Sequence, residues 1–484
     1  MAIPREILEI PRPRNTIVVA YGKNRTMYAV RERIGCRYEN GRRLPITGKT
    51  IGHIICGEYV PKDLSTTIQS LSKNPIELKD WANIVLCVNI SSFLLKDLLL
   101  FYNYSDAIRI YCISILRVCY PGIRDNELSE SYEESFLSEM YPNVGISKNT
   151  VSVFLNNIGK AYSRICRFMQ LRVSKVEKNH HLIIDGTLKT DNSECDTFSE
   201  FSRKFKESKA KEISILYAYD LELAEPICCQ CFPGNMIDAT AYENFINQNE
   251  IKRGVIVGDK GFPSSSAKKY FTKNKNLHYL NPLKRNCKYI NQYDLTNFTD
   301  QLPEDESILC KKIKINRYKC IYVFKDINKS YREDCGWLKK AKNNKNFNVG
   351  DFNKDRELFG VVIFESNLDT DLSTIYKIYD TRWEIEILMR YYKQTCEFDT
   401  TRVHDDYSVI GSEFCNFLST IITYKLLSLF RSSLLLESHT YKKIMRILHK
   451  AKKVKFGEVW KGVKINPSQE KILDKLNLLS EFTH

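Results

Sequence analysis

The sequence predicts a mixed α/β protein whose core is interrupted by a β-rich insertion and preceded by a small β meander and a helical region. Three observations predict this class. Short apolar, β-branched runs alternate with helical segments after residue 177, the stretch before them is helical, and the first 62 residues alternate strand-like runs with turns. At 484 residues the chain also exceeds what one hydrophobic core usually supports.

The predicted organisation has six parts, separated where the texture of the sequence changes. They are a β meander over 1–62, a helical region over 63–176, the first part of the core over 177–286, an insertion over 287–360, the second part of the core over 361–428 and a basic C-terminal region over 429–484.

The two N-terminal parts carry local signals. Within "TIVVAYGKNRTMYAV" and "CRYENGRRLPITGKTIGHII", a Gly-Lys-Asn stretch and Asn40-Gly41 are typical of hairpin turns. In the helical part, Ser147 precedes "KNTVSVFL" and is a candidate N-cap. The segment that follows fits a helix-turn-helix and also fits a helix that only packs against the next domain, and the sequence leaves both open.

Charge and cysteine content indicate the partner and the compartment. Lys and Arg number 73 against 58 Asp and Glu, and the net charge of +15 favours a polyanionic partner such as nucleic acid. The 16 Cys are scattered along a long chain, which is typical of reduced intracellular thiols. The most apolar run, "IVLCVNISSFLLKDLLLFY", is interrupted by Asn89, Lys96 and Asp97, so we expect a packed helix and no membrane span. The N-terminus lacks an apolar signal core, so we expect a soluble intracellular protein.

Two acidic residues end strand-like runs. Asp185 follows the apolar run in "LIID", Asp259 follows the one in "VIVGD", and each meets a Gly within two residues. A carboxylate at the end of a buried strand is costly unless it is paired or binds a cation. For either residue alone, the alternative is a cap or turn role.

A third acidic residue lies in "YDTRWEIEILMRYYK", which has no Gly or Pro and predicts a helix. At about 100° of rotation per residue, Tyr379, Arg382, Glu386 and Lys393 lie within roughly 60° of one another, and Arg390 lies close to them. The apolar residues centre beside this polar stripe, which places the carboxylate near the boundary of the core. A solvated, salt-bridged helix face is the alternative.

Three carboxylates, Asp185, Asp259 and Glu386, would present hard oxygen ligands to Mg²⁺ or Mn²⁺. Two such ions about 3.5–4 Å apart activate an attacking oxygen and stabilise the leaving oxygen in phosphodiester displacement. Lys and Arg side chains beside Glu386, including Arg390, would bind the phosphate backbone. The metal chemistry and the positive net charge therefore agree.

Together, "IIDGT", "GDKGF" and "YDTRWEIEILMRYYK" resemble the DDE transposases of prokaryotic insertion sequences, and specifically the insertion-sequence-four group. The last catalytic helix of that group reads Tyr-x2-Arg-x3-Glu-x6-Lys, and the resemblance covers about residues 180 to 425. It implies a ribonuclease-H-like catalytic core with a β-rich insertion. It also implies that two Mg²⁺ or Mn²⁺ ions are held by the metal-binding triad of Asp185, Asp259 and Glu386. Tyr379, Arg382 and Lys393 would contact the transposon-end DNA.

The resemblance implies a DNA transposase that cuts at terminal inverted repeats and joins the 3′-OH ends to target DNA. The alternatives are a ribonuclease-H-like nuclease without strand transfer and a non-catalytic DNA-binding derivative. The expected partners are double-stranded DNA, as transposon ends and target, and a second copy of the chain in the DNA complex. The expected location is the cytoplasm of a prokaryote, in association with the nucleoid, and the helical region over 63–176 is a candidate DNA-binding region.

Trp337, in "EDCGWLKK", is the aromatic residue of the insertion that we expect to contact DNA by stacking on a flipped base. It lies next to Lys339 and Lys340, which would hold the adjacent phosphates. The alternative is that Trp337 packs the insertion onto the core, because large aromatic side chains are usually buried.

Overall fold

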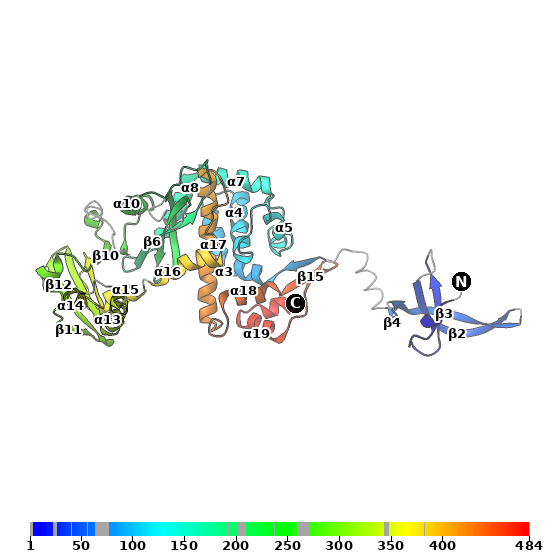
Figure 1. The fold of residues 1–484 in the computed structure, drawn as a ribbon. Coiled ribbons are helices and arrows are strands. Elements are labelled where there is room, and N and C mark those ends of the chain that lie inside the picture. The colour runs from blue at the N-terminus through cyan, green and yellow to red at the C-terminus, as the bar shows by residue number, and fades with distance from the viewer. Residues whose placement is uncertain are drawn as a thin grey trace. The chain divides into compact units, whose positions relative to one another are not determined.

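The computed structural model describes most of the chain. The described residues are 3–22, 27–39, 41–55, 57–62, 77–191, 193–201, 210–236, 238–258, 271–342, 348–381 and 383–483. They belong to two compact units, one of Met1–Leu78 with Val454–Lys461 and one of Lys79–Lys453 with Gly462–His484. Figure 1 shows the elements of both units.

The N-terminal unit is built around an antiparallel sheet whose four strands follow chain order. Its elements are α1 (Arg5–Leu8), β1 (Thr16–Tyr21), β2 (Met27–Glu39), β3 (Arg42–Ile55) and β4 (Glu58–Pro61). Val18, Val30 and Ile54 form its buried apolar cluster. The strands follow the meander order that the turn signals predict, whereas the turn residues 23–24 and Asn40 lie outside the described residues.

A series of helices begins the second unit. These are α3 (Ala82–Leu98), α4 (Tyr104–Cys119), α5 (Leu128–Glu133), α6 (Leu137–Met140), α7 (Lys148–Lys160) and α8 (Tyr162–Val173). The apolar run noted in the sequence is α3, whose buried side chains belong to the main core. Within the described ranges, no helix has the length and apolar character that crossing a membrane would require. Ser147 occupies the N-cap position of α7, but its hydroxyl bonds the Thr150 hydroxyl at 2.8 Å instead of a backbone amide.

Helix α7 packs against α17 (Asp406–Ser432) at a crossing marked by two glycines. A Cβ atom at Gly159 would collide with the carbonyl oxygen of Tyr407, and one at Gly411 would collide with that of Leu155. Because no side chain fits at either position, the two backbones approach each other directly. Of the two alternatives for this segment, the structure favours a helix that packs against the next part of the chain.

One large sheet organises the second unit (Figure 1). Its strands are β6 (His181–Thr190), β7 (Glu212–Asp220), β8 (Glu225–Pro233), β9 (Gly254–Val257), β10 (Leu277–Leu283), β11 (Asp300–Leu302), β12 (Asp305–Asn316), β13 (Lys319–Asp326) and β14 (Val361–Ser366). Their spatial order is β11-β12-β13-β14-β10-β9-β6-β7-β8. Strand β9 runs parallel to β6 and β10, and the other neighbours are antiparallel. The fold is therefore mixed α/β with a large mixed sheet.

The strands of the predicted insertion continue this sheet instead of forming one of their own. Strand β13 pairs with β14, and β14 pairs in turn with β10 of the core. The helices of this region are α12 (Tyr289–Gln292), α13 (Ile327–Ala341) and α14 (Val349–Arg356). Ile321 and Val323 of β13, Val361 and Ile363 of β14 and Leu295 of the turn after α12 form a small apolar cluster of their own.

The predicted helix that begins at Tyr379 is described in three segments. They are α15 (Leu372–Thr381), α16 (Trp383–Arg390) and a π-helical turn, η1 (Tyr391–Thr395), while Arg382 lies outside the described residues. After η1, the Cys396 N–H donates to the carbonyl oxygen of Tyr391, five residues back, at 2.9 Å. A π turn holds more residues than an α turn, so the regular rotation used to place Lys393 does not apply there.

The remaining elements are one helix between β8 and β9 and the elements near the two ends of the second unit's chain segments. They are α10 (Asp238–Gln248), α18 (Tyr441–His449), α19 (Pro467–Lys475), α20 (Leu479–Thr483) and the strands β5 (Leu78–Asp80), β15 (Lys452–Phe456) and β16 (Val459–Gly462). These three strands form a small sheet in the order β16-β15-β5.

Candidate functional site

The strand that contains Asp185 and the strand that leads to Asp259 are parallel neighbours. Ile183 of β6 is in register with Val257 of β9, and Asp185 and Asp259 each follow two residues later in the chain. Asp185 is half-buried on β6, where its Oδ1 accepts from the Gly186 N–H at 2.8 Å. Asp259 lies outside the described residues, so the structure describes the strand that leads to it but not the residue itself.

The face of β6 that carries Asp185 is the face on which the Glu386-bearing helix lies. Asp185 is paired across the sheet with Tyr217 of β7, and directly opposed residues share a face. The ring of Tyr217 packs against Tyr392 of η1, with centroids 5.7 Å apart, and against Phe417 of α17 at 6.0 Å. Helix α16 itself contacts β6. The first and third predicted carboxylates therefore come from elements that face each other.

Helix α16 buries one side and exposes the other. Ile385 and Leu388 are buried, whereas Glu386 is exposed. Trp383 is 53% exposed, and the guanidinium of Arg390 lies 5.6 Å from its ring centroid. Positions three and seven residues apart share a helix face, so Trp383, Glu386 and Arg390 form one exposed surface. The sequence reasoning missed Trp383, although this spacing was available in the sequence.

The other predicted DNA contacts on these helices differ in their surroundings. Tyr379 is half-buried, and its ring packs edge-on against Phe364 of β14 with centroids 5.0 Å apart. Lys393 is half-buried in the π turn. Arg382 lies outside the described residues. The structure thus places Tyr379 partly in the packing between α15 and the sheet.

Trp337 lies on α13, within the insertion. It is half-buried, its ring packs against Phe352 of α14 with centroids 5.0 Å apart, and its Nε1–H donates to Asp355 Oδ2 at 3.3 Å. These contacts join two helices of the insertion to each other, whereas the packing alternative joined the insertion to the core. The stacking role of Trp337 stays a prediction.

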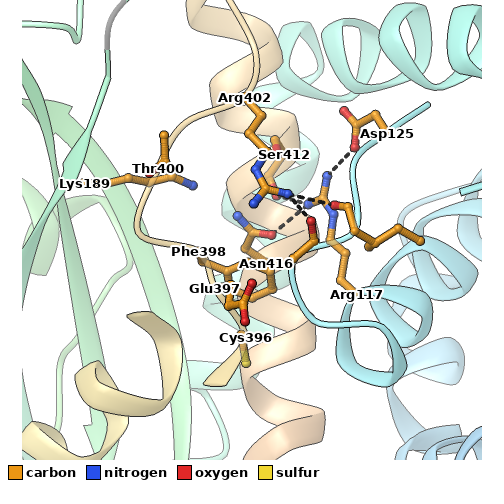
Figure 2. Close-up of a pocket in the computed structure, with 12 residues that line it drawn as sticks. Arg117, Asp125, Lys189, Cys396, Glu397, Phe398, Thr400, Arg402, Ser412 and Asn416 are labelled. Atoms are coloured by element: carbon orange, nitrogen blue, oxygen red, sulfur yellow. Dashed lines mark hydrogen bonds and ion pairs between the residues drawn. The ribbon is translucent and has the colours of Figure 1, made fainter. Parts of the chain in front are cut away.

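A small pocket lies beside α17 (Figure 2). Three cations line it, namely Arg117, Lys189 and Arg402. Each already has a partner: Arg117 bonds groups on α17 and Asp125, Lys189 pairs with Glu413, and Arg402 donates to backbone carbonyl oxygens. The enclosed space of about 30 Å³ has room for ordered water and not for a nucleotide. We therefore assign this pocket no ligand.

A separate acidic group with histidines lies at the N-terminal end of β6, before Asp185. Ligand atoms of His180, Asp220 and Glu222 all lie within 4.8 Å of one another. These carboxylates are already engaged, because His180 Nδ1 lies 2.7 Å from Asp220 Oδ2 and His181 Nδ1 lies 2.5 Å from Glu222 Oε1. Asp220 Oδ1 also accepts two backbone N–H bonds from the following turn. Hydrogen bonds and the turn account for this group without an ion.

A pair of carboxyl groups lies just past the C-terminal end of β6. Burial and a hydrogen bond with Asp406 raise the pKa of Asp196 to about 8. Burial also acts to raise the pKa of Asp406, but its hydrogen bonds with Asp196 and Thr197 lower it overall. The opposite directions of the two pKa shifts favour a single proton on the pair, carried by Asp196.

The described cysteines lie outside the candidate site. Every cysteine that the structure describes is a free thiol, as the scattered spacing predicts. Burial raises the pKa of the Cys229 and Cys231 thiols on β8 well above its ordinary value, which makes them poor nucleophiles and poor metal ligands.

Comparison with known proteins supports the class that this arrangement indicates. Residues 177–409 match the family model described as "Transposase DDE domain", over somewhat less than half of the chain. The match supports a DDE transposase, and its range includes β6, β9 and α16.

Among solved structures, the chain is similar to one described as "Cryo-EM structure of piggyBac transposase synaptic complex with hairpin DNA". The TM-score is 0.39 at 12% sequence identity, over 78% of this chain and 82% of that chain. No curated protein matches the sequence.

Proposed function

We propose that the protein is a DNA transposase of the insertion-sequence-four group, with a ribonuclease-H-like core, that cuts at terminal inverted repeats and joins the 3′-OH ends to target DNA. The observation that carries the proposal is the placement of Asp185 on β6 opposite the helix that bears Glu386, within a region that matches the transposase DDE domain. The first half of the reaction is hydrolysis of a phosphodiester, which leaves a 3′-OH. The second half is attack of that 3′-OH on a target phosphodiester.

The family implies divalent metal ions, and the donor set fits them. Asp185 and Glu386 offer carboxylate oxygens from elements that contact each other, and the exposure of Glu386 leaves room for the water ligands that Mg²⁺ and Mn²⁺ retain. Asp185, Asp259 and Glu386 would hold two such ions, which supply charge stabilisation to the entering and leaving oxygens. The histidine-paired group at His180 lies elsewhere and takes no part in this proposal.

We propose that the cations around Glu386 bind the DNA backbone. Arg390 and Lys393, together with Tyr379 and Arg382, would position the transposon end, and contacts of this kind fix register without reading sequence. Trp383 lies beside Glu386 and is 53% exposed, with the Arg390 guanidinium 5.6 Å from its ring centroid. Its exposed ring surface would stack on a base at the cut site. We prefer Trp383 to Trp337, whose ring and Nε1–H are engaged inside the insertion.

The experiment uses oligonucleotides that carry the inverted repeats flanking the reading frame. Wild-type protein should nick them with Mg²⁺ or Mn²⁺, and pre-cut ends should join to a target plasmid. Nicking without joining would favour the nuclease alternative, and end binding without either step would favour the non-catalytic one. Cross-linking of the DNA complex tests the proposed homodimer.

Lys393→Ala serves as the test of backbone contact. It should weaken end binding at every salt concentration and should reduce the slope of log K against log salt by about one phosphate contact. Lys342→Ala, at the end of α13, is the matched control and should leave the slope unchanged. An unchanged slope for Lys393→Ala would remove this residue from the interface.

A further inference from the structure

The buried carboxylate of Glu413, on α17, joins three separate elements of the second unit. Glu413 is 3% exposed, and its Oε1 receives the ammonium of Lys189 and the Asn416 Nδ2–H at 2.9 Å. Its Oε2 accepts the Tyr392 O–H at 2.6 Å. Both oxygens are thus hydrogen-bonded, which is what makes a buried charge tolerable.

Two of these partners lie close in the chain to the first and third predicted carboxylates. Lys189 is on β6, four residues after Asp185 and on the same face of the strand. Tyr392 lies in η1, directly after the helix that carries Glu386. Glu413 therefore binds the strand of one carboxylate and the helix of the other.

The geometry of Tyr392 depends on the π turn. The extra residue of η1 changes the phase of the helix, and Tyr392 is fully buried there against Tyr217 and Phe398. Burial and the nearby charge of Glu413 raise the pKa of the Tyr392 phenol well above its ordinary value. The phenol is therefore always a hydrogen-bond donor to Glu413 at physiological pH.

A second layer of hydrogen bonds fixes Asn416 in one orientation. Arg117 of α4 donates to Asn416 Oδ1 at 2.8 Å and to the Ser412 carbonyl oxygen at 2.9 Å, and it pairs with Asp125 at 3.1 Å (Figure 2). Because arginine only donates, the amide oxygen of Asn416 must face it and the amide nitrogen must face Glu413. The network is thus satisfied from end to end.

We propose that Glu413, Lys189 and Tyr392 are positioning residues that set the separation between the carboxylates of Asp185 and Glu386. The proposal rests on the proposed function, since it assigns the network a role in metal binding and strand cleavage. A helix that slides or rotates by about 1 Å can cost on the order of 100-fold in rate. A single buried anion with rigid partners on both elements limits such movement.

Tyr392→Phe tests the proposal, because it removes one hydrogen bond and keeps the ring in its packing. Tyr111→Phe is the matched control: Tyr111 is a fully buried tyrosine of α4, hydrogen-bonded to Ser91 at 2.9 Å, and its partners are not part of the Glu413 network. We would measure Mn²⁺ affinity by electron paramagnetic resonance, the kcat for nicking, the Kd for end DNA and the thermal melting temperature of both variants.

Tyr392→Phe should lower kcat and weaken Mn²⁺ binding by about tenfold each while the Kd for DNA stays unchanged. Tyr111→Phe should change only the melting temperature. Equal behaviour of the two variants in Mn²⁺ affinity and kcat would overturn the positioning role. Should Tyr392→Phe fail to fold, Asn416→Ala removes a donor from the other oxygen of Glu413 and carries the same expectation.

The Mn²⁺ measurement separates this proposal from the proposed function. Suppose that the protein never cuts DNA but binds Mn²⁺, and that Asp185→Asn removes this binding. This result would contradict the proposed transposase function and would leave Mn²⁺ binding as the test of the positioning role. In that case weaker Mn²⁺ binding by Tyr392→Phe than by Tyr111→Phe would still support the positioning role, and equal binding would still overturn it.

Discussion

Two acidic sites near β6 have different surroundings. Beside the N-terminal end of the strand, His180 and Asp220 are hydrogen-bonded to each other, and turn amides occupy the remaining oxygen of Asp220. In the middle of the strand, Asp185 is half-buried on the face that meets the Glu386 helix, and the nearby cation Lys189 is paired with Glu413. Asp185 is the candidate metal ligand because its strand contacts the helix that carries a second predicted carboxylate, whereas Asp220 lies among a histidine and turn amides. The presence of acids and histidines alone does not identify a metal site.

The largest expected effect distinguishes the Asp185 site from the His180–Asp220 group. Asp185→Asn should reduce nicking at least about 1000-fold, because several kcal/mol of charge stabilisation by the metal ions are lost, while the melting temperature stays nearly unchanged. Asp220→Asn should do the opposite and lower stability by about 1–3 kcal/mol through the loss of partners for a buried group. Nicking assays and thermal melts of both variants check this. Reversed outcomes would mean that the metal site lies at His180.

Trp337 and Trp383 extend the comparison, because Trp337 packs inside the insertion whereas Trp383 is exposed on α16. Trp337→Ala should cost about 1–3 kcal/mol of stability, since it removes a half-buried ring from the packing of α13 on α14. Trp383→Ala should leave the melting temperature nearly unchanged and weaken binding of cut-site DNA by about 1–3 kcal/mol through lost stacking. Chemical denaturation and fluorescence anisotropy give the two numbers. A destabilised Trp383→Ala protein with normal DNA binding would contradict the assignment.

Metal-dependent stability gives a smaller effect. Mn²⁺ at about 100 times its Kd should raise the unfolding free energy of the wild-type protein by about 2.7 kcal/mol, because the ion binds only the folded state. Glu386→Gln should lose most of this gain, and His180→Ala should keep it. Calorimetry with and without the ion provides the measurement, and retention by Glu386→Gln would place the ion elsewhere.

The smallest effect concerns the carboxyl pair just past β6. The pKa of Asp196 is raised in the folded protein to about 8, so the folded state holds this proton more tightly and loses stability as pH rises from about 4 to about 8. The lowered pKa of Asp406 acts only in acid, below its ordinary value. Asp196→Asn should therefore flatten the fall of the melting temperature between pH 5 and pH 8. A variant with an unchanged pH profile would show that folding does not raise the pKa of Asp196.

Much of the fold follows from local sequence signals, and parts of the site do not. The apolar runs before Asp185 and Asp259 correspond to β6 and to the strand β9 beside it, and the helical signature corresponds to α15, α16 and η1. The sequence predicts that Asp185 ends its strand, but β6 continues to Thr190, because its pairing with β7 extends past the apolar run. No pattern in the sequence predicts the π-helical turn η1. Lys189, Tyr392 and Glu413 likewise share no spacing, because only the tertiary packing brings them together.

Long-range pairing explains the other differences. The Lys- and Asn-rich composition of residues 287–360 differs from that of the core, and it therefore predicts a separate segment. Strand pairing depends on the partner strand and not on composition, so β13 pairs with β14 all the same. Trp337 and Trp383 are both aromatic residues near cations in the sequence. Only their contacts in the folded chain distinguish them.

The continuity of the sheet has a consequence for shortening the protein. Strand β14 lies between β13 and β10, so removal of residues 287–360 would strip one whole side of β14 of its partner. An interior strand would become a bare edge, which invites pairing with other chains and aggregation. A truncated version would need a charged or proline-bearing edge in place of β13. Residues 287–360 are therefore a structural part of the large sheet. Natural variation in the length of this region is expected in its hairpin turns and at its helix ends, away from the paired strands β13 and β14.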